Sequence, residues 1–191
     1  MKLEDRRVRR TKQLIKQSLI ELMHEKSFKE ITVKDITERA DLNRGTFYLH
    51  YIDIYDLLSK IEDETLQAIE EMLLDYRCQI NMPSCYELLN EFFSYIEDNR
   101  DLFQILLNSE SEGIFLNKLQ HLIKTMGLDL MKVAYKDTSR PHYSYFLSFV
   151  LNGVLGVTEQ WFNNGMDMSS TEMATMIDHF IMDGISILAK L

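Results

Sequence analysis

The sequence is poor in the residues that interrupt helices. It has 2 prolines and 7 glycines among 191 residues, so long segments contain no helix-breaking residue. Apolar residues make up 46% of the chain and charged residues 27%, proportions that are usual for a globular protein. The composition therefore predicts an all-α fold with a substantial core.

Cysteine is also scarce. The 2 cysteines, Cys78 and Cys85, have a spacing that matches no zinc or thiol-redox motif. This argues against a disulfide-based scaffold and favours the reducing cytoplasm as the location of the protein.

Long hydrophobic runs are missing as well. The longest uncharged stretch covers residues 141–158 and contains polar residues such as His142 and Asn152, so we expect a buried helix there and no membrane span. The N-terminal segment is charged and has no apolar run behind it that could act as a secretory signal. Both absences agree with a cytoplasmic protein.

The motifs of common enzymes and metal sites are absent. The 5 histidines show no His-x-x-x-His spacing, so a structural zinc site is not expected, although a sensor site assembled across helices stays open. The sequence contains neither a Gly-rich phosphate loop nor a Gly-x-Ser-x-Gly elbow. We expect no enzyme activity, no cofactor and no metal.

Charge is distributed unevenly along the chain. Residues 1–51 contain 12 Lys and Arg against 8 Asp and Glu, whereas residues 52–191 contain 9 against 22. A nucleic acid would meet only the basic segment, so the overall net charge of −9 does not exclude a nucleic-acid partner. The same asymmetry could also arise by chance on solvated helix faces.

The first 51 residues have the pattern of a helix–turn–helix unit. Apolar residues at helical spacing predict a long helix over residues 5–25. Thr32, with Asp35 three residues later, predicts the start of a short second helix. After a turn, Asn43 is a good N-cap for a third helix up to His50. The alternative is an ordinary three-helix packing unit with a solvated third helix.

Six further helices are predicted after this unit. They cover residues 53–78, 84–98, 101–108, 110–135, 141–164 and 170–189. Three of their starts carry a Ser-x-x-Glu capping box, at Ser84, Ser109 and Ser169. With the first three, the chain has about nine helices and no predicted strand.

The run from Ile31 to Tyr51, followed by Asp56-Leu57-Leu58, resembles the DNA-binding domain of TetR/AcrR-family regulators. The most specific part is the sequence Arg44-Gly-Thr-Phe-Tyr-Leu-His-Tyr51. A weaker likeness runs from Leu151 to Trp161 and resembles the C-terminal domain of a Firmicutes-type branch. The resemblance implies a DNA-binding domain over residues 1–52 and a helical dimerisation and effector-binding domain over residues 53–191.

Carried over by position, the resemblance implies which residues meet DNA. The predicted set is Arg10, Thr11, Lys12, Thr32, Asn43, Arg44, Gly45, Thr46, Tyr48 and His50. Arg can read guanine and Thr can meet a thymine methyl group, whereas Tyr, His and Lys suit phosphates. One departure is that relatives often have a Lys just after the recognition helix, where this chain has Ile54.

The C-terminal half is rich in methionine and aromatic residues, which suit an adaptable pocket. We expect Met126, Phe149 and Trp161 to line a pocket for an apolar or cationic effector, unless these side chains only fill the core.

The family's two last helices pair with those of a second copy. The predicted dimer interface comprises Gly153, Gly156, Met173, Ile177, Phe180, Ile181, Gly184, Ile185 and Leu188, unless this stripe packs only within its own chain.

The sequence therefore predicts a homodimeric DNA-binding transcriptional regulator. Repression of a pseudo-palindromic operator, relieved by a small molecule, is the expected mode, because most relatives repress. The alternative is a helical co-regulator of the same fold that acts through a protein partner and does not bind DNA itself.

Overall fold

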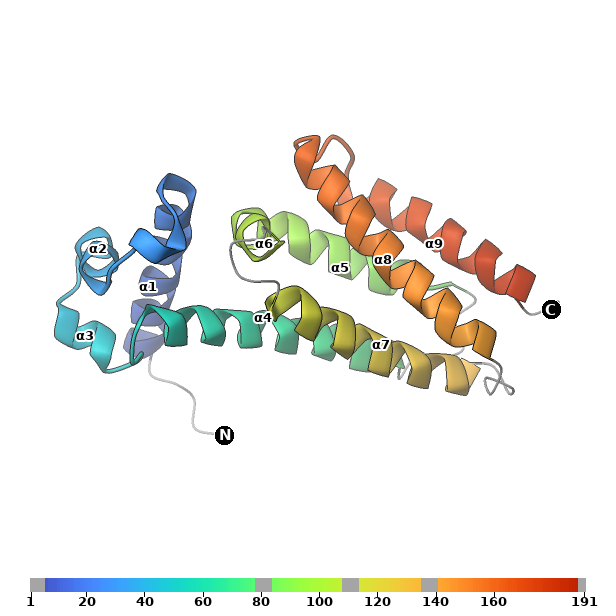
Figure 1. Ribbon diagram of the computed structural model, residues 1–191, viewed down its shortest axis with the longest axis horizontal. Coiled ribbons are helices and arrows are strands. Elements are labelled where there is room, and N and C mark those ends of the chain that lie inside the picture. Colours follow the sequence, from blue (N-terminus) through green and yellow to red (C-terminus); the bar gives the residue numbers. More distant parts are fainter. Residues whose placement is uncertain (1–5, 78–83, 108–113, 135–140, 189–191) are drawn as a thin grey trace. The chain divides into compact units, whose positions relative to one another are not determined.

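The computed structural model describes residues 6–77, 84–107, 114–134 and 141–188 (Figure 1). These residues form nine α-helices and one short 3₁₀ helix, and they contain no strand. The bounds are α1 (Arg6–Glu25), η1 (Phe28–Glu30), α2 (Val33–Arg39), α3 (Arg44–Tyr48), α4 (Ile54–Arg77), α5 (Tyr86–Asp98), α6 (Arg100–Leu107), α7 (Ile114–Ala134), α8 (Pro141–Asn163) and α9 (Ser170–Leu188). The predicted all-α fold is confirmed.

The chain divides into two compact units. The first contains the chain up to Thr65, and the second begins at Leu66 and contains the later described helices. The division falls inside α4, which is one continuous helix from Ile54 to Arg77. The domain boundary predicted between residues 52 and 53 lies at the start of the same helix and stays a prediction.

The first unit has a core made by one face of each of its helices. Ile15 and Leu19 of α1, Ile36 of α2, Phe47 of α3 and Leu57 of α4 are at most 1% exposed. Ile15 and Leu19 lie four residues apart on the buried face of α1, and each of the other three helices contributes one of these buried side chains. Phe47 anchors α3, whose other side chains are then held toward the surface.

A local cap and an ion pair to α1 fix the two ends of α2. Thr32 and Asp35 form the predicted capping box, in which the Thr32 side chain accepts from the Asp35 N–H and the Asp35 carboxylate accepts from the Thr32 N–H. Arg39, at the other end of α2, donates two hydrogen bonds to Glu25 of α1, at 2.7 and 2.8 Å. Asp41 then turns the chain with a left-handed φ of 52°.

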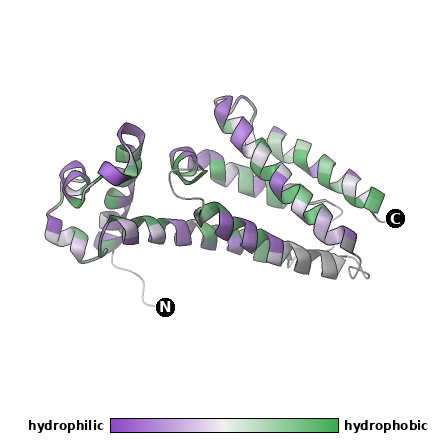
Figure 2. Ribbon diagram, in the orientation of Figure 1, coloured by the Kyte–Doolittle hydropathy of each residue, from purple (hydrophilic) through white to green (hydrophobic). Residues whose placement is uncertain are grey.

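The second unit is built around α5 and α9, which contact each other extensively. Phe93 of α5 and Met173 of α9 are 0% and 1% exposed, and Trp161 of α8 packs edge-on against Phe93 with ring centroids 5.8 Å apart. Hydrophobic residues occupy much of α9 (Figure 2). No helix in the described part of the chain is both long and apolar enough to cross a bilayer.

The start of α5 differs from the prediction. A capping box from Ser84 to Glu87 was expected, but α5 begins at Tyr86 and Cys85 is its N-cap residue. The Cys85 N–H and the Ser84 hydroxyl instead donate to the carboxylate of Asp178 on α9, at 2.8 and 3.0 Å. The Ser84 hydroxyl also accepts from the Tyr86 N–H at 3.0 Å, so the start of α5 is capped both locally and by a residue far away in the chain. The box between Ser169 and Glu172 forms as predicted, and the box at Ser109 lies outside the described residues.

Candidate nucleic-acid interface and ligand cavity

The third helix presents its polar side chains to solvent. Asn43 caps it by accepting the Gly45 N–H at 2.8 Å, and the buried Phe47 fixes its rotation about its axis. Asn43, Arg44, Gly45 and Tyr48 are exposed as a result, whereas Thr46 and His50 are half-buried. The structure therefore brings the predicted residues of this helix together on and beside one exposed face.

Gly45 leaves the backbone of this face uncovered. An added Cβ would meet only the Asn43 side chain, at 3.4 Å, and the position is exposed. Packing inside the chain therefore does not require a glycine here. A bare backbone at this place allows close approach by an external group such as a phosphate.

The other predicted DNA-contacting residues lie on α1 and before α2. Arg10 is exposed, and Thr11 and Lys12 are half-buried on the first turns of α1. Thr32 is exposed, but its hydroxyl already takes part in the capping box by donating to Asp35 at 2.8 Å. Of the two cations among these residues, Arg10 is exposed and Lys12 is half-buried.

Lys60 of α4 hydrogen-bonds to the backbone just after α3, the predicted recognition helix. Its ammonium group donates to the backbone carbonyl of His50 at 3.1 Å and to the carboxylate of Asp56 at 2.8 Å. It also lies 5.2 Å from the centre of the Tyr51 ring, within cation–π range. Sequence reasoning missed this residue, although the Asp56–Lys60 pair at i, i+4 was a visible signal.

Apolar side chains are exposed next to the same helix. Leu49, the residue directly after α3, is 80% exposed, and Ile52, just before α4, is 78% exposed. Neither was among the predicted site residues. Exposed aliphatic groups at such a place can contact thymine methyl groups in a major groove.

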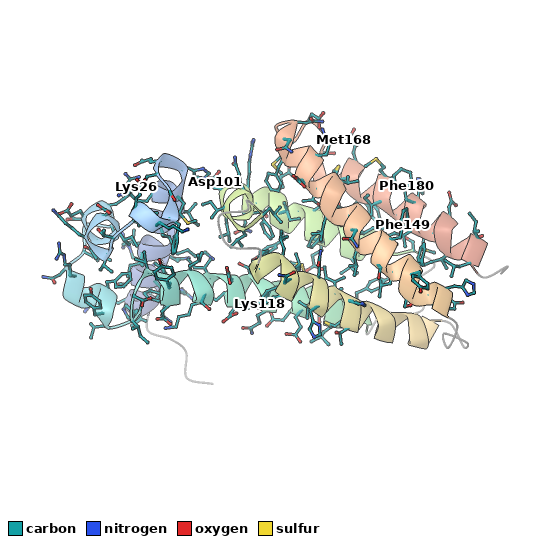
Figure 3. The ribbon with its side chains drawn as sticks, viewed as in Figure 1. Lys26, Asp101, Lys118, Phe149, Met168 and Phe180 are labelled. Carbon is teal, nitrogen blue, oxygen red and sulfur yellow. The ribbon has the colours of Figure 1, made fainter. Side chains whose placement is uncertain are left out.

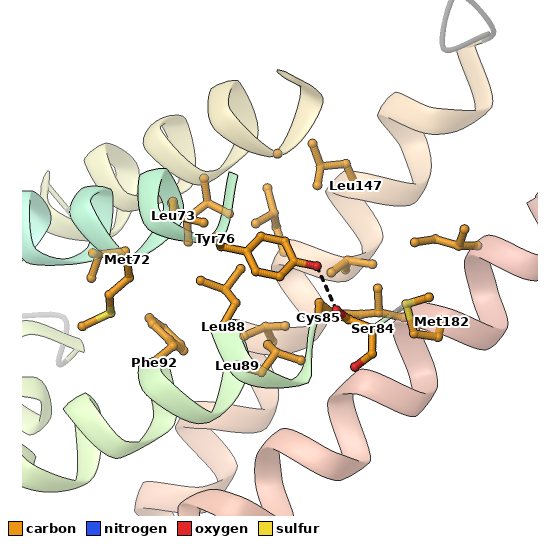
Figure 4. Close-up of a pocket in the computed structure, with 18 of the residues that line it drawn as sticks. Met72, Leu73, Tyr76, Ser84, Cys85, Leu88, Leu89, Phe92, Leu147 and Met182 are labelled. Atoms are coloured by element: carbon orange, nitrogen blue, oxygen red, sulfur yellow. Dashed lines mark hydrogen bonds between the residues drawn. The ribbon is translucent and has the colours of Figure 1, made fainter. Parts of the chain in front are cut away.

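The second unit contains a cavity of about 240 Å³ (Figure 4). Its walls come from α4, α5, α7, α8 and α9, together with the two residues before α5. The lining residues are Ile69, Met72, Leu73, Tyr76, Ser84, Cys85, Leu88, Leu89, Phe92, Ile123, Gly127, Phe146, Leu147, Val150, Leu151, Val154, Leu155, Ile181, Met182 and Ile185.

Polar groups of the cavity wall gather where α4 faces the start of α5. Figure 4 shows the Tyr76 ring reaching from α4 toward Ser84, where its hydroxyl donates to the Ser84 carbonyl at 3.0 Å. Cys85 lies beside it, and its thiol is 3.2 Å from the Asp178 carboxylate. Burial, helped by the nearby negative charge, raises the pKa of the Cys85 thiol, so the sulfur stays protonated.

The three residues predicted to line an effector pocket are not among the residues that line this cavity. Phe149 is 72% exposed, Met126 is half-buried, and Trp161 is 2% exposed in the core, where its ring N–H donates to the Met168 carbonyl. Their sequence neighbours Val150 and Gly127 line the cavity instead. A helix turns about 100° per residue, so an adjacent position faces a different side.

The predicted interface residues separate into two groups. Gly153, Gly156 and Phe180 are exposed, and a Cβ on either glycine would meet nothing within 4 Å. The others face the inside of their own chain. Met173 and Ile177 are buried, Ile181 and Ile185 line the cavity, a Cβ on Gly184 would lie 2.6 Å from Phe146, and Leu188 packs against the buried cluster of Tyr143, Leu147 and Leu151.

The reason for this separation is that α9 has a wide apolar surface. One part of it is covered by α5 and α8, and the other part remains exposed with Phe180 and Ile187, at 64% and 63%. On α8, Tyr145 and Phe149 are exposed at 76% and 72%. Phe149 and Phe180 can be located on their helices in Figure 3.

Two protein families match the sequence. Residues 17–61 match the family of bacterial regulatory proteins, tetR family. Residues 84–183 match a C-terminal region of TetR transcriptional regulators. The first match covers most of the helix–turn–helix segment, and the second covers more than half of the chain.

Similar proteins support these matches. The chain is 24% identical over 166 residues to an HTH-type transcriptional regulator of Haemophilus influenzae, covering 83% of this chain and 78% of that protein. It is 22% identical over 97 residues to the HTH-type transcriptional regulator YxbF of Bacillus subtilis, covering 49% of this chain. The match spans only about a quarter of the length of YxbF, at 26%.

Solved structures share the fold. A TetR transcriptional regulator from Streptococcus agalactiae superimposes with a TM-score of 0.65 at 21% identity, covering 93% of this chain and 96% of that one. The regulator FadR from Bacillus subtilis, in complex with stearoyl-CoA, gives a TM-score of 0.65 at 13% identity, covering 90% and 98%.

Proposed function

Because the chain belongs to the TetR family of bacterial transcriptional regulators, we propose that it is a homodimeric repressor that a small molecule releases from a pseudo-palindromic operator. Members of this family are transcription factors and not enzymes. We further propose that it acts in the cytoplasm, where its operator DNA would be.

The exposed face of α3 is the observation that carries the proposal. Arg44 and Tyr48 project from a helix whose rotation is fixed by the Asn43 cap and by the buried Phe47. Arg44 can donate two hydrogen bonds to the edge of guanine, and Tyr48 and His50 can bond phosphates. Arg10 of α1 adds a cation for the flanking backbone.

A second copy of the chain is needed for specificity. One recognition helix of this length reads too few base pairs, so two must bind successive major grooves about 35 Å apart. The exposed aromatic side chains of α8 and α9, together with the uncovered Gly153 and Gly156, suit close packing against the same helices of a partner.

Helix α4 offers a physical link between ligand and DNA. Its later turns supply Ile69, Leu73 and Tyr76 to the cavity, and its first turns hold the recognition helix through Lys60. A ligand that binds the DNA-competent and incompetent shapes with different affinity would shift the balance between them. A coupling of about 1–3 kcal/mol would weaken operator binding roughly 5- to 150-fold.

The test is a titration of the purified protein on DNA from its own upstream region, with a shuffled duplex as control. Wild type should bind the upstream fragment selectively, and Arg10→Ala should reduce the salt slope by about 0.9. A variant with Ala at Arg44, Thr46, Tyr48 and His50 should lose the selectivity while its circular dichroism stays unchanged. If this quadruple variant bound the upstream fragment with wild-type affinity, the proposal would be refuted.

A further inference from the structure

The cavity of the second unit is lined mostly by apolar side chains. We infer that its ligand is an uncharged, largely apolar molecule of about ten non-hydrogen atoms with one hydroxyl group. The number of atoms is scaled from the cavity volume: a cavity of about 150 Å³ holds benzene, with six non-hydrogen atoms, and this cavity measures about 240 Å³. The inference rests on the proposed function, since it names the chemical class of the effector.

The walls leave a charged ligand without a partner. Among the described residues that line the cavity, none is Asp, Glu, Lys, Arg or His. Leu, Ile, Val, Met and Phe side chains supply nearly all of the surface. An ionised group moved from water to such a surface loses its hydration and gains no hydrogen bond or counter-charge in return. An alkyl chain, in contrast, gains about fourfold in affinity for every methylene that it buries.

The polar corner of the cavity further disfavours an anion. The Asp178 carboxylate lies behind Ser84 and Cys85 and accepts from both of them, at 2.8 to 3.2 Å. Its negative charge repels a carboxylate or phosphate placed near Tyr76. The same carboxylate does not line the cavity and one of its oxygens already accepts three hydrogen bonds, so it is poorly placed for a cationic ligand.

What remains at this corner is neutral hydrogen-bonding chemistry. The Tyr76 hydroxyl and Ser84 form one hydrogen-bonded pair at the edge of the apolar space. The hydrogens of Tyr76, Ser84 and Cys85 at this corner are already donated to the Ser84 carbonyl and to Asp178, so a ligand hydroxyl group can join by donating to the Tyr76 oxygen or to the Ser84 carbonyl. The rest of the molecule then lies against Leu88 and Leu147 (Figure 4).

The test compares three molecules of nine carbons with different head groups. Binding of 1-nonanol, nonanoate and nonylamine to the full chain at pH 7.5 is measured by titration calorimetry. We expect 1-nonanol to bind at least tenfold more tightly than either charged analogue. Across alcohols of six to twelve carbons, affinity should rise about fourfold per methylene and stop rising near nine carbons.

Matched variants locate the binding. Leu88→Trp fills the cavity and should weaken 1-nonanol binding at least tenfold, whereas Leu122→Trp, at a half-buried position of α7 that does not line the cavity, should leave it within about twofold. If Leu88→Trp does not fold by circular dichroism, Val150→Phe gives the same test from α8.

Three results would overturn the inference. The first is tighter binding of nonanoate or nonylamine than of 1-nonanol, and the second is no binding of any alcohol. The third is unchanged 1-nonanol binding in both Leu88→Trp and Val150→Phe. Operator titration of the same wild-type preparation separates the two proposals. Selective DNA binding without alcohol binding refutes only the ligand class, and loss of selective DNA binding refutes the proposed function.

Discussion

Asp35 shows how one carboxylate stabilises the first unit. It accepts hydrogen bonds from Lys26 of the preceding segment and from the backbone and side chain of Thr32, at 2.8 to 2.9 Å. The hydrogen bond from Lys26 is the largest cause, followed by those from Thr32, and together they lower the pKa of Asp35 to about 2. Folding therefore favours the ionised carboxylate of Asp35, and the ionised carboxylate in turn stabilises the fold.

This lowered pKa predicts a pH dependence. The stabilisation is fully present above the ordinary Asp pKa of 3.8 and is lost as pH falls through about 2. Asp35→Asn should lower the midpoint of thermal unfolding at pH 7, and its difference from wild type should shrink between pH 4 and pH 2. Circular dichroism melting curves measure this, with Glu30→Gln, at an exposed position of η1, as the control. A difference that persists below pH 2 contradicts the assignment.

At the scale of elements, Lys60 ties α4 to the end of the recognition helix. Lys60→Met removes the hydrogen bond to the His50 carbonyl and the ion pair with Asp56. We expect operator affinity to fall about three- to tenfold, because the recognition helix is then held less firmly. A titration of operator DNA at several salt concentrations measures both the affinity and the salt slope.

The salt slope distinguishes positioning from direct contact. If Lys60 only positions the helix, the slope stays as in wild type, whereas a lost phosphate contact would reduce it by about 0.9. Lys29→Met removes the same charge from an exposed place in the same unit and serves as the control. Equal effects of both substitutions would argue against a specific role of Lys60.

Asp178 joins α9 to the start of α5. It is 9% exposed and accepts from the Cys85 N–H and from the Ser84 hydroxyl. Asp178→Ala leaves these donors without their acceptor, at a cost of about 1–3 kcal/mol for each that stays buried and unsatisfied. Urea unfolding should show this loss, and Asp183→Ala, at an exposed position of the same helix, should change stability little.

The same substitution has a second consequence for Cys85. Burial is the main cause that raises the pKa of its thiol, and the Asp178 carboxylate adds to it. In a Cys78→Ser background, Asp178→Ala should therefore speed alkylation of Cys85 at pH 8, because a larger fraction is thiolate. Unchanged alkylation together with unchanged stability would mean that Asp178 does not cap α5 in solution.

At the scale of the whole molecule, we expect the exposed aromatic residues of α8 and α9 to decide the oligomeric state. Phe180→Glu places a charge on the exposed part of α9, so we expect monomers at micromolar concentration and loss of operator binding. Sedimentation velocity measures the first effect and an operator titration the second. Phe180 is a better test than the predicted Ile181, which lines the cavity of its own chain.

A matched control keeps this test specific. Thr175→Glu introduces the same charge at another exposed position of α9, on a side away from Phe180. It should leave the protein dimeric and able to bind its operator. Monomeric wild-type protein at the same concentration would contradict the dimer proposal directly.

Helix positions, three of the predicted caps and the helix–turn–helix unit were determined by the sequence alone. The predicted helix over residues 170–189 is observed as Ser170–Leu188, and the caps at Thr32, Asn43 and Ser169 form as expected. These features depend on apolar spacing and on hydrogen bonds that reach at most a few residues along the chain, so local sequence carries the information.

Only the tertiary structure decided which apolar surfaces are covered. The sequence shows that α9 is apolar over a wide arc, but the packing of α5 and α8 buries Ile177 and leaves Phe180 exposed. The cap of α5 by Asp178 joins residues 93 positions apart, and the cavity is assembled from five helices. Contacts of this kind depend on how separate helices meet in space, which periodicity within one helix does not specify.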